Sequence, residues 1–231
     1  MKLLWAWIVD NLYFLKKRLT YKSVSSFSHT AMVDRRLSQA QKSVKGLNAV
    51  FGDSIMHFGE PYFTQVSIED YAIAGETTAG LLKYFEALVF VARPKAIVIH
   101  IGGNDDRGNI SNIEKLDNLK QLYKIATKYC RKVAWLETVA LADPNDFPLY
   151  PMSEEAKLFH TKVNTIKMPE FAQMVENAGI PVIRIRQRMT KDGTVKGFLK
   201  PEYGAGDTVH VNEKCYKEVY VPTLKEYFEI H

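Results

Sequence analysis

From residue 47 onward, short runs of β-branched and aliphatic residues alternate with longer stretches in which apolar residues recur at helical spacing. Strands that alternate with helices along a chain form a parallel sheet with helices on both faces. The expected strands are residues 47–51, 65–71, 95–101, 132–137 and 181–185, and the expected helices are residues 78–92, 113–130, 153–178 and 212–228. The sequence therefore predicts a doubly wound α/β domain, in which the irregular stretches 140–152 and 190–206 shape the rim of a pocket.

The first 45 residues differ from the rest of the chain in charge. They contain nine Lys and Arg residues against Asp10 and Asp34, so they hold the whole positive excess behind the net charge of +5. Within them, residues 3–18 have apolar side chains at helical spacing and end in three cations, which predicts a short amphipathic helix. A membrane-spanning helix needs about 20 consecutive apolar residues, and Asp10 interrupts this apolar run well before that length. A cleaved signal peptide is also disfavoured, because no clear small-x-small cleavage site follows.

These features divide the chain into a basic leader with its linker, residues 1–45, and one domain, residues 46–231. The leader is expected to dock on the domain or on a second subunit, or to lie at a membrane surface as a peripheral anchor. We expect a cytoplasmic or peripherally membrane-associated protein, with secretion less favoured. The domain itself is nearly neutral, so its charge does not indicate a nucleic-acid partner.

Residues with catalytic chemistry follow the ends of the predicted strands, where ligands bind in open parallel sheets. Ser54 follows the first strand, Gly75 the second and Asn104 the third, while Asp207 and His210 precede the last helix. A serine hydroxyl becomes a nucleophile when a base takes its proton and a third group orients that base. We therefore predict Ser54, His210 and Asp207 as catalytic residues. The backbone N–H groups of Ser54 and Gly75 and the side-chain amide of Asn104 are the predicted oxyanion donors.

Each of these segments, taken alone, also fits a structural role. Asp53 or Ser54 could cap a helix, residues 102–105 could form a simple turn, and Asp207 could cap the last helix. Their joint order at successive strand ends favours the catalytic interpretation.

The remaining polar residues do not indicate a metal or nucleotide site. Asp53, Asp105 and Asp106 offer too few oxygen ligands for a hard cation, and we expect them to order loops by accepting backbone N–H bonds. His57 is expected to point away from the serine, and His100 to be a buried core histidine. The sequence has no glycine-rich phosphate loop after a strand and no closely spaced Cys and His set, and its two cysteines are expected to be buried.

Four segments occur in the order of the motif blocks of the SGNH, or GDSL-type, hydrolase superfamily, which the chain resembles over roughly residues 46–228. They are Phe51-Gly52-Asp53-Ser54-Ile55, Tyr71 to Thr78, His100 to Asp105 and Asp207 to Asn212. The second block departs most from the pattern, with Asp70 where Asn is usual, Ala72 where Gly is common and Glu76 where Asp is frequent. The resemblance implies a three-layer α/β/α sandwich with a flavodoxin-like, five-stranded parallel sheet and no cofactor. Within the superfamily, the chain is most similar to platelet-activating-factor acetylhydrolase-type small esterases.

The resemblance and the residues together predict a serine esterase or acylhydrolase that works through an acyl-enzyme intermediate. Its substrate would carry an acetyl or other acyl group on a carbohydrate, a lipid or a small alcohol, and thioester hydrolysis is also compatible. The alternative is a non-catalytic flavodoxin-like binding or assembly module that its leader docks to a partner or membrane. A degenerate module would be expected to have lost at least one of the five predicted site residues, and all five are present.

Overall fold

The computed structural model describes residues 29–108, 110–146 and 152–230. Its sheet contains the strands β1 (Asn48–Gly52), β2 (Ile68–Asp70), β3 (Ala96–His100), β4 (Lys132–Leu136) and β5 (Val182–Ile183). They pair in the order β2-β1-β3-β4-β5, and every pairing is parallel. This is the predicted flavodoxin-like order. The chain reverses its direction of winding between β1 and β3, and the carboxyl ends of these neighbouring strands border the crevice where such sheets bind ligands.

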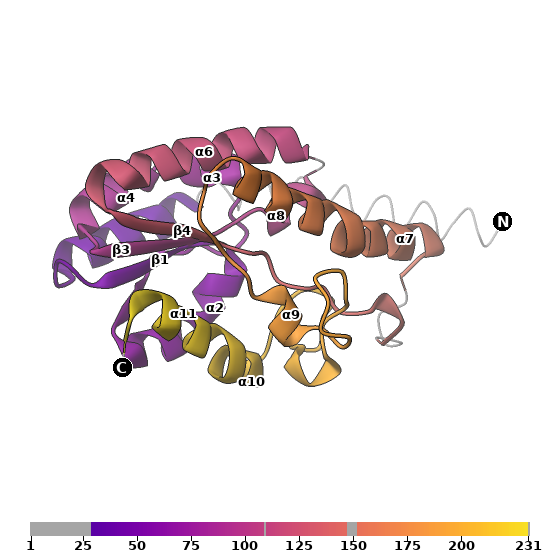
Figure 1. Ribbon diagram of the computed structural model, residues 1–231. Coiled ribbons are helices and arrows are strands. Elements are labelled where there is room, and N and C mark those ends of the chain that lie inside the picture. The colour runs from indigo at the N-terminus through magenta and orange to yellow at the C-terminus, as the bar shows by residue number, and fades with distance from the viewer. Residues whose placement is uncertain (1–28, 109, 147–151, 231) are drawn as a thin grey trace.

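Helices cover both faces of this sheet, which confirms the predicted three-layer α/β/α fold (Figure 1). One layer contains α3 (Thr78–Leu82), α4 (Phe85–Ala92), α6 (Asn112–Tyr129) and α8 (Met168–Asn177), and the other contains α2 (Ser54–Phe63), α9 (Arg186–Met189), α10 (Glu213–Cys215) and α11 (Val221–Phe228). The shorter elements in the connections are α5 (Gly103–Arg107), η1 (Thr64–Val66), η2 (Pro144–Asp146) and η4 (Pro201–Tyr203). The helix α7 (Glu154–Lys162) extends the α8 layer beyond the sheet (Figure 1).

The two layers rest on two separate apolar clusters, because successive strand residues face opposite sides of the sheet. Phe51 and Trp135 point into the α3, α4, α6 and α8 layer, whereas Val50 and Val98 point into the layer of α2 and α11. All four side chains are fully buried. The strands are apolar on both faces, as expected for a parallel sheet that helices cover on both sides.

Four predicted elements differ in detail from the observed ones. The helix expected over residues 78–92 is divided into α3 and α4. The strand expected over residues 65–71 begins only at Ile68, because Ser67 has a left-handed backbone (φ 58°) that ends the preceding turn of η1. The helices expected over residues 153–178 and 212–228 are continuous, but each contains a π-helical turn. The turn η3 (Val163–Lys167) lies between α7 and α8, and η5 (Tyr216–Tyr220) lies between α10 and α11.

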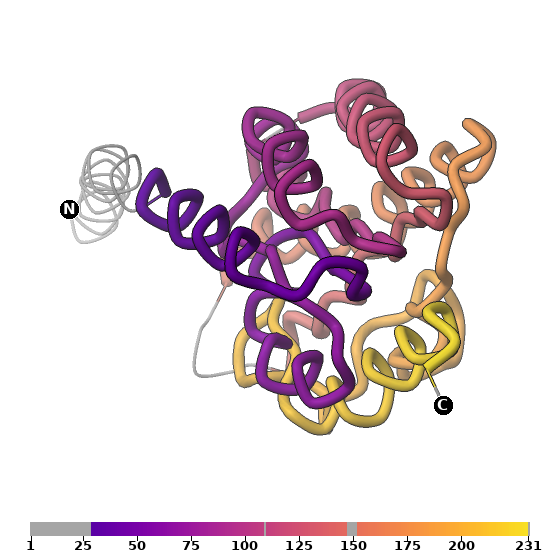
Figure 2. Tube along the Cα trace, turned by 90° about the vertical axis from the view of Figure 1, so that its left-hand side faces the viewer, coloured from indigo at the N-terminus to yellow at the C-terminus, as the bar shows by residue number. Residues whose placement is uncertain are grey.

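A helix over residues 29–42 packs on the domain beside α2 and β2 (Figure 2). Its Ala40 is fully buried in the cluster around Phe51, and Leu37 packs against that cluster. This part of the predicted leader is therefore docked on the domain. The amphipathic helix predicted for residues 3–18 lies outside the described residues. None of the helices in the described ranges is long and apolar enough to cross a membrane.

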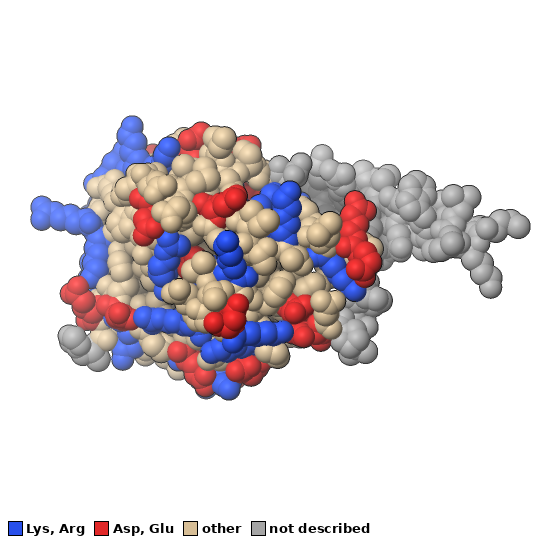
Figure 3. Space-filling model, turned by 45° about the vertical axis from the view of Figure 1, so that its right-hand side comes forward, with Lys and Arg blue, Asp and Glu red and all other residues tan. Residues whose placement is uncertain are grey.

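Charged side chains of both signs are interspersed on the face shown in Figure 3, and no extended patch of one sign gathers there. This distribution agrees with the nearly neutral composition of the domain. The two cysteines, Cys130 and Cys215, are free and buried, as predicted.

Candidate active site

Ser54 is the first residue of α2, and only Asp53 separates it from the end of β1. The preceding Asp53 caps the helix, since its carboxylate accepts the N–H of Ile55 at 3.0 Å. The Ser54 Oγ lies 3.0 Å from the Nε2 of His210, which comes from the loop before α10. The Nδ1 of the same ring lies 2.7 Å from the Oδ2 of Asp207. The structure thus brings together Ser54, His210 and Asp207 in one line of hydrogen-bonding contacts.

Asp207 orders both the histidine ring and its own loop. Its Oδ1 accepts the backbone N–H groups of Val209 at 2.8 Å and of His210 at 2.6 Å, while its Oδ2 lies 2.7 Å from the ring Nδ1. Partial burial raises the pKa of this carboxyl, but the hydrogen bonds from His210 and Val209 outweigh burial and hold the pKa below its usual value. Asp207 is therefore ionised at neutral pH and can stabilise a positive charge on the imidazole. Phe58 packs edge-on against that imidazole, with ring centroids 5.3 Å apart.

The predicted oxyanion donors lie in two neighbouring loops. Asn104, in α5 after β3, lines the same cavity as Ser54, and its Nδ2 donates to the backbone oxygen of Glu76 at 3.0 Å. Gly75 has a left-handed backbone (φ 80°), which explains the glycine at this position. Gly75 is not among the residues that line the cavity. Its loop is connected to the site by the hydrogen bond from Asn104 to the backbone of the next residue, Glu76. The N–H groups of Ser54 and Gly75 have no hydrogen-bond partner within the described ranges.

A cavity of about 240 Å³ opens beside Ser54. Its apolar wall comes from Leu141, Val163 and Met168, which form a small cluster of their own with Val209 packed against it. The complete lining is Asp53, Ser54, Ile55, His100, Gly103, Asn104, Arg107, Thr138, Val139, Leu141, Met152, Ala156, Phe159, His160, Val163, Met168, Thr208 and Val209. Leu141 and Met152 belong to the stretch 140–152 that was expected to form a rim, whereas residues 190–206 do not line this cavity.

Of the acidic residues near the serine, Asp53 and Asp105 accept backbone N–H groups, as predicted, whereas Asp106 forms an ion pair instead. Asp105 accepts the Thr78 N–H at 3.1 Å and its hydroxyl at 2.5 Å, which fastens the loop after β3 to the start of α3. Asp106 pairs with the buried Lys115 at 2.9 Å. His100 is buried against the Leu136 carbonyl, and burial lowers its pKa to about 4. It also lines the cavity, so it is a core histidine with one side toward the site.

Asp53 gives the site a pH-dependent contribution to stability. Burial raises the pKa of its carboxyl to about 7, and the Ile55 N–H opposes this only in part. An acid whose pKa is higher in the folded state than in the unfolded state destabilises the fold as pH rises, because the unfolded chain releases the proton first. The window runs from about pH 4, where an unfolded Asp ionises, to about pH 7.

We therefore expect Asp53→Asn to gain stability relative to the wild type as pH rises through this window. Asn caps a helix about as well as Asp, so the cap is kept while the titration is removed. The gain has an upper limit of about 1.4 kcal/mol per pH unit. Urea unfolding of both proteins at several pH values between about 4 and 8 measures it. A difference in unfolding free energy that stays constant over the window would contradict the raised pKa.

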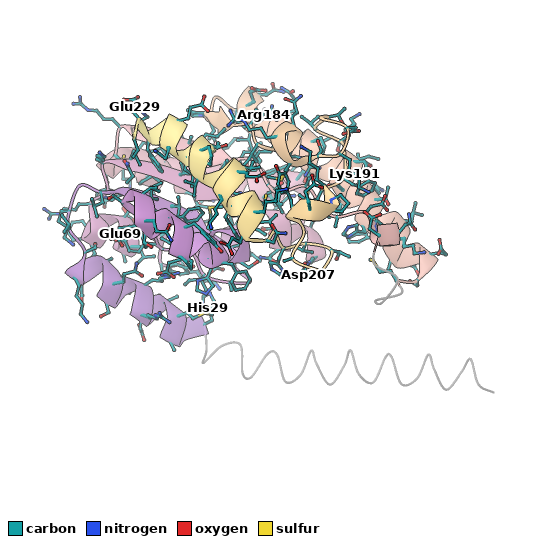
Figure 4. The ribbon with its side chains drawn as sticks, turned by 90° about the horizontal axis from the view of Figure 1, so that it is seen from below. His29, Glu69, Arg184, Lys191, Asp207 and Glu229 are labelled. Atoms are coloured by element: carbon teal, nitrogen blue, oxygen red, sulfur yellow. The ribbon has the colours of Figure 1, made fainter. Side chains whose placement is uncertain are left out.

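Sequence reasoning missed a second network, which fastens the Gly75 loop from the other side. The buried Glu76 carboxylate accepts the Tyr84 hydroxyl at 2.5 Å and lies 2.7 Å from the Nε2 of His29, on the helix over residues 29–42. Figure 4 shows His29 at the start of that helix. The available signal was Glu76, where the superfamily pattern more often has Asp.

The same N-terminal helix also contributes a buried cation. The guanidinium of Arg36 donates to Asp70 at 2.7 Å and to Glu60 at 3.1 Å, and lies 2.9 Å from the Nδ1 of His57. Within the described ranges, the carboxylates of Asp70 and Glu60 and the His57 ring lie close enough together to resemble a set of metal ligands. The Arg36 guanidinium already supplies the positive charge between them. His57 points toward Arg36, consistent with the expectation that it is not the base for Ser54.

The model of the GDSL-like lipase/acylhydrolase family matches residues 27–220. The chain therefore belongs to this family.

Solved structures of similar fold come from several bacteria. A GDSL-like lipase from Bacteroides thetaiotaomicron has 20% identity and a TM-score of 0.68, over 85% of this chain and 97% of that one. A candidate platelet activating factor from Streptococcus pneumonia has 20% identity and a TM-score of 0.65, over 91% and 98%. An acetylxylan esterase from Geobacillus stearothermophilus has 14% identity and a TM-score of 0.58, over 82% and 97%. A comparison with curated protein sequences finds no match. Because the sequence identities are this low, the structural similarities establish the fold alone.

Proposed function

We propose that the chain is a serine esterase that hydrolyses acyl esters through an acyl-enzyme intermediate. The observation that carries the proposal is the unbroken set of contacts from Ser54 through His210 to Asp207, at 3.0 and 2.7 Å. His210 Nε2 takes the proton of Ser54 while Oγ attacks the ester carbonyl, and the Asp207 carboxylate stabilises the imidazolium that results. His210 then protonates the leaving alcohol. In the second step it activates a water molecule that hydrolyses the acyl-serine ester and restores Ser54.

The negative charge on the carbonyl oxygen needs donors that are fixed before the reaction begins. We assign this role to the N–H groups of Ser54 and Gly75 and to the side-chain amide of Asn104. The first two have no partner among the described residues, and the Asn104 amide carries a second N–H besides the one that donates to Glu76. The bond from Asn104 to Glu76 also fixes the distance between the two loops that hold these donors.

The cavity beside Ser54 supports a small acyl or alcohol group as its occupant. Pockets for drug-sized ligands usually have volumes of about 300–1,000 Å³. The cavity volume of about 240 Å³ is smaller than this range. Its wall of Leu141, Val163 and Met168 favours a hydrocarbon portion. Both an acetyl ester, the kind of substrate named for the Geobacillus stearothermophilus neighbour, and a short-chain lipid ester fit this description. The same chemistry would serve a thioester.

Asp207→Asn tests the proposed role of the carboxylate. The amide cannot carry the charge that stabilises the imidazolium and can favour the wrong ring tautomer, so we expect kcat for 4-nitrophenyl acetate to fall by about 10²–10⁴-fold. Steady-state hydrolysis measures kcat, and Asp192→Asn is a control for an exposed Asp that lies outside the site. A kcat in Asp207→Asn equal to that of the wild type would contradict the assignment.

A further inference from the structure

Arg107 is a cation at the cavity for which the proposed mechanism has no use. It is the last residue of α5, it is exposed, and among the lining residues it is the only Lys or Arg. Its guanidinium makes no hydrogen bond or ion pair with any other described residue. Neighbouring cations are already engaged, since Lys115 lies 2.9 Å and Lys167 lies 3.9 Å from the Asp106 carboxylate. As far as the described residues go, the Arg107 guanidinium is thus available to bind a group from outside the protein.

The charge of Arg107 is only partly offset at the mouth of this apolar space, because burial raises the pKa of Asp53 to about 7 although Arg107 lowers it. Asp53 is the only carboxyl group in the lining; it is buried, and its Oδ1 accepts the Ile55 N–H. His160, another lining residue, is held at 2.9 Å from the Ala142 carbonyl. Burial lowers the pKa of His160, and the charge of Arg107 lowers it further. A positive field therefore acts across the cavity from Arg107.

We propose that Arg107 is a specificity-determining residue that selects esters carrying an anionic oxygen group, a carboxylate or a phosphate, on the portion that occupies this cavity. A planar guanidinium can donate two parallel hydrogen bonds to either group, a geometry that a neutral rim cannot provide. Leu141, Val163 and Met168 would hold the hydrocarbon portion between the scissile ester and the anion. The proposal rests on the esterase function and specifies its substrate class.

The test compares matched pairs of substrates in the wild type and in Arg107→Gln. One pair places the charge on the acyl side, 4-nitrophenyl hexanoate against the 4-nitrophenyl half-ester of adipic acid. The other places it on the alcohol side, propyl acetate against 3-acetoxypropyl phosphate followed by pH-stat. For each pair, kcat/KM of the anionic ester is divided by kcat/KM of the neutral one, after correction for spontaneous hydrolysis.

In at least one pair we expect the wild type to prefer the anionic ester and Arg107→Gln to lower this preference by about tenfold. Arg107→Lys should keep part of the preference, because it retains the charge but loses the paired donors. Arg131→Gln is the matched control, an exposed arginine directly before β4 at the opposite end of the strands. The wild-type preference should also weaken with added salt, because the guanidinium is exposed.

The outcomes separate this proposal from the esterase function on which it rests. The pair that responds shows whether the cavity receives the acyl or the alcohol portion. If neutral esters are hydrolysed but the preference is the same in the wild type and Arg107→Gln for both pairs, the role of Arg107 is refuted. If none of the four esters is hydrolysed by the wild type, the esterase function itself fails for these substrates. Melting temperatures of all variants show that any lost preference does not come from unfolding.

Discussion

Ser54→Ala should lower kcat/KM for ester hydrolysis by at least about 10⁴-fold, the scale seen when a catalytic serine is removed from a hydrolase that works with a histidine base. Without Oγ, no acyl-enzyme can form, and His210 loses the group that lies 3.0 Å from its Nε2. The backbone of α2 and the Asp53 cap are unchanged by the substitution, so the melting temperature should stay close to that of the wild type. Hydrolysis of 4-nitrophenyl acetate together with thermal unfolding measures both effects.

Ser38→Ala is the matched control for this variant. Ser38 lies on the helix over residues 29–42, outside the site, so its replacement should leave ester turnover unchanged. Substantial activity in Ser54→Ala would refute Ser54 as the nucleophile. A wild type without activity on any ester would give weight to the alternative of a binding module that keeps the serine loop as structure.

The largest effect on stability should come from Arg36→Ala, with a loss of about 3–5 kcal/mol in the free energy of unfolding. Arg36 is 3% exposed, and its partner Asp70 is completely buried. Besides the pair with Asp70 at 2.7 Å, its Nε donates to the Ala72 carbonyl at 2.9 Å. Removing the guanidinium leaves a buried carboxylate without its cation, which costs more than the pair contributes when intact.

The loss should depend on pH in a defined direction. Burial raises the pKa of Asp70 to about 7 even though Arg36 lowers it, so removal of Arg36 favours the protonated acid still more. Below about pH 7 Asp70 can take up a proton and avoid the cost of an unpaired charge, whereas at higher pH it cannot do so as readily. Urea unfolding at about pH 5 and about pH 8 should therefore show a larger loss at the higher value.

Arg35→Ala is the control for Arg36→Ala, because Arg35 is the neighbouring exposed residue on the same helix. A surface substitution of this kind usually changes stability by about 0.5 kcal/mol or less. Equal effects of Arg35→Ala and Arg36→Ala would contradict the structural role assigned to the buried ion pair.

The N-terminal helix has a consequence for where the domain begins. The family model starts at residue 27, inside the segment 1–45 that its charge marked as a leader. The docked helix over residues 29–42 brings His29 to Glu76 and Arg36 to Asp70, so it supports both ends of the loop that contains Gly75. We propose that this helix is part of the hydrolase domain, and that the separable leader lies before it.

Local sequence patterns predicted the alternation of strands and helices and the placement of Ser54, Asp207 and His210 after strands or before the last helix, whereas the strand order was implied by the resemblance to the SGNH superfamily. Asp207 and His210 are three residues apart, and Ser54 directly follows a run of buried residues. The pairing of Arg36 with Asp70 could not be predicted in the same way. It joins residues that are distant in the sequence, and nothing in the periodicity of either segment indicates it. The division between α3 and α4 was also not predicted, although the contact at the break is local, since the Tyr84 hydroxyl donates to Glu76 of the preceding loop.

The cavity lining was also beyond local patterns. Arg107 lies only three residues after Asn104, but no local pattern shows that its side chain lines the cavity while Lys115 and Lys167 lie near the Asp106 carboxylate. Long-range contacts of this kind decide which polar groups remain available to a substrate.

Labelling with a fluorophosphonate probe, read as intact protein mass, tests the central claim most directly, because the probe reacts covalently with an activated serine. We expect a single adduct on the wild type and none on Ser54→Ala, while the Ser38→Ala control is labelled like the wild type. An unlabelled wild type, or an adduct that persists in Ser54→Ala, would contradict the claim that Ser54 is an activated nucleophile.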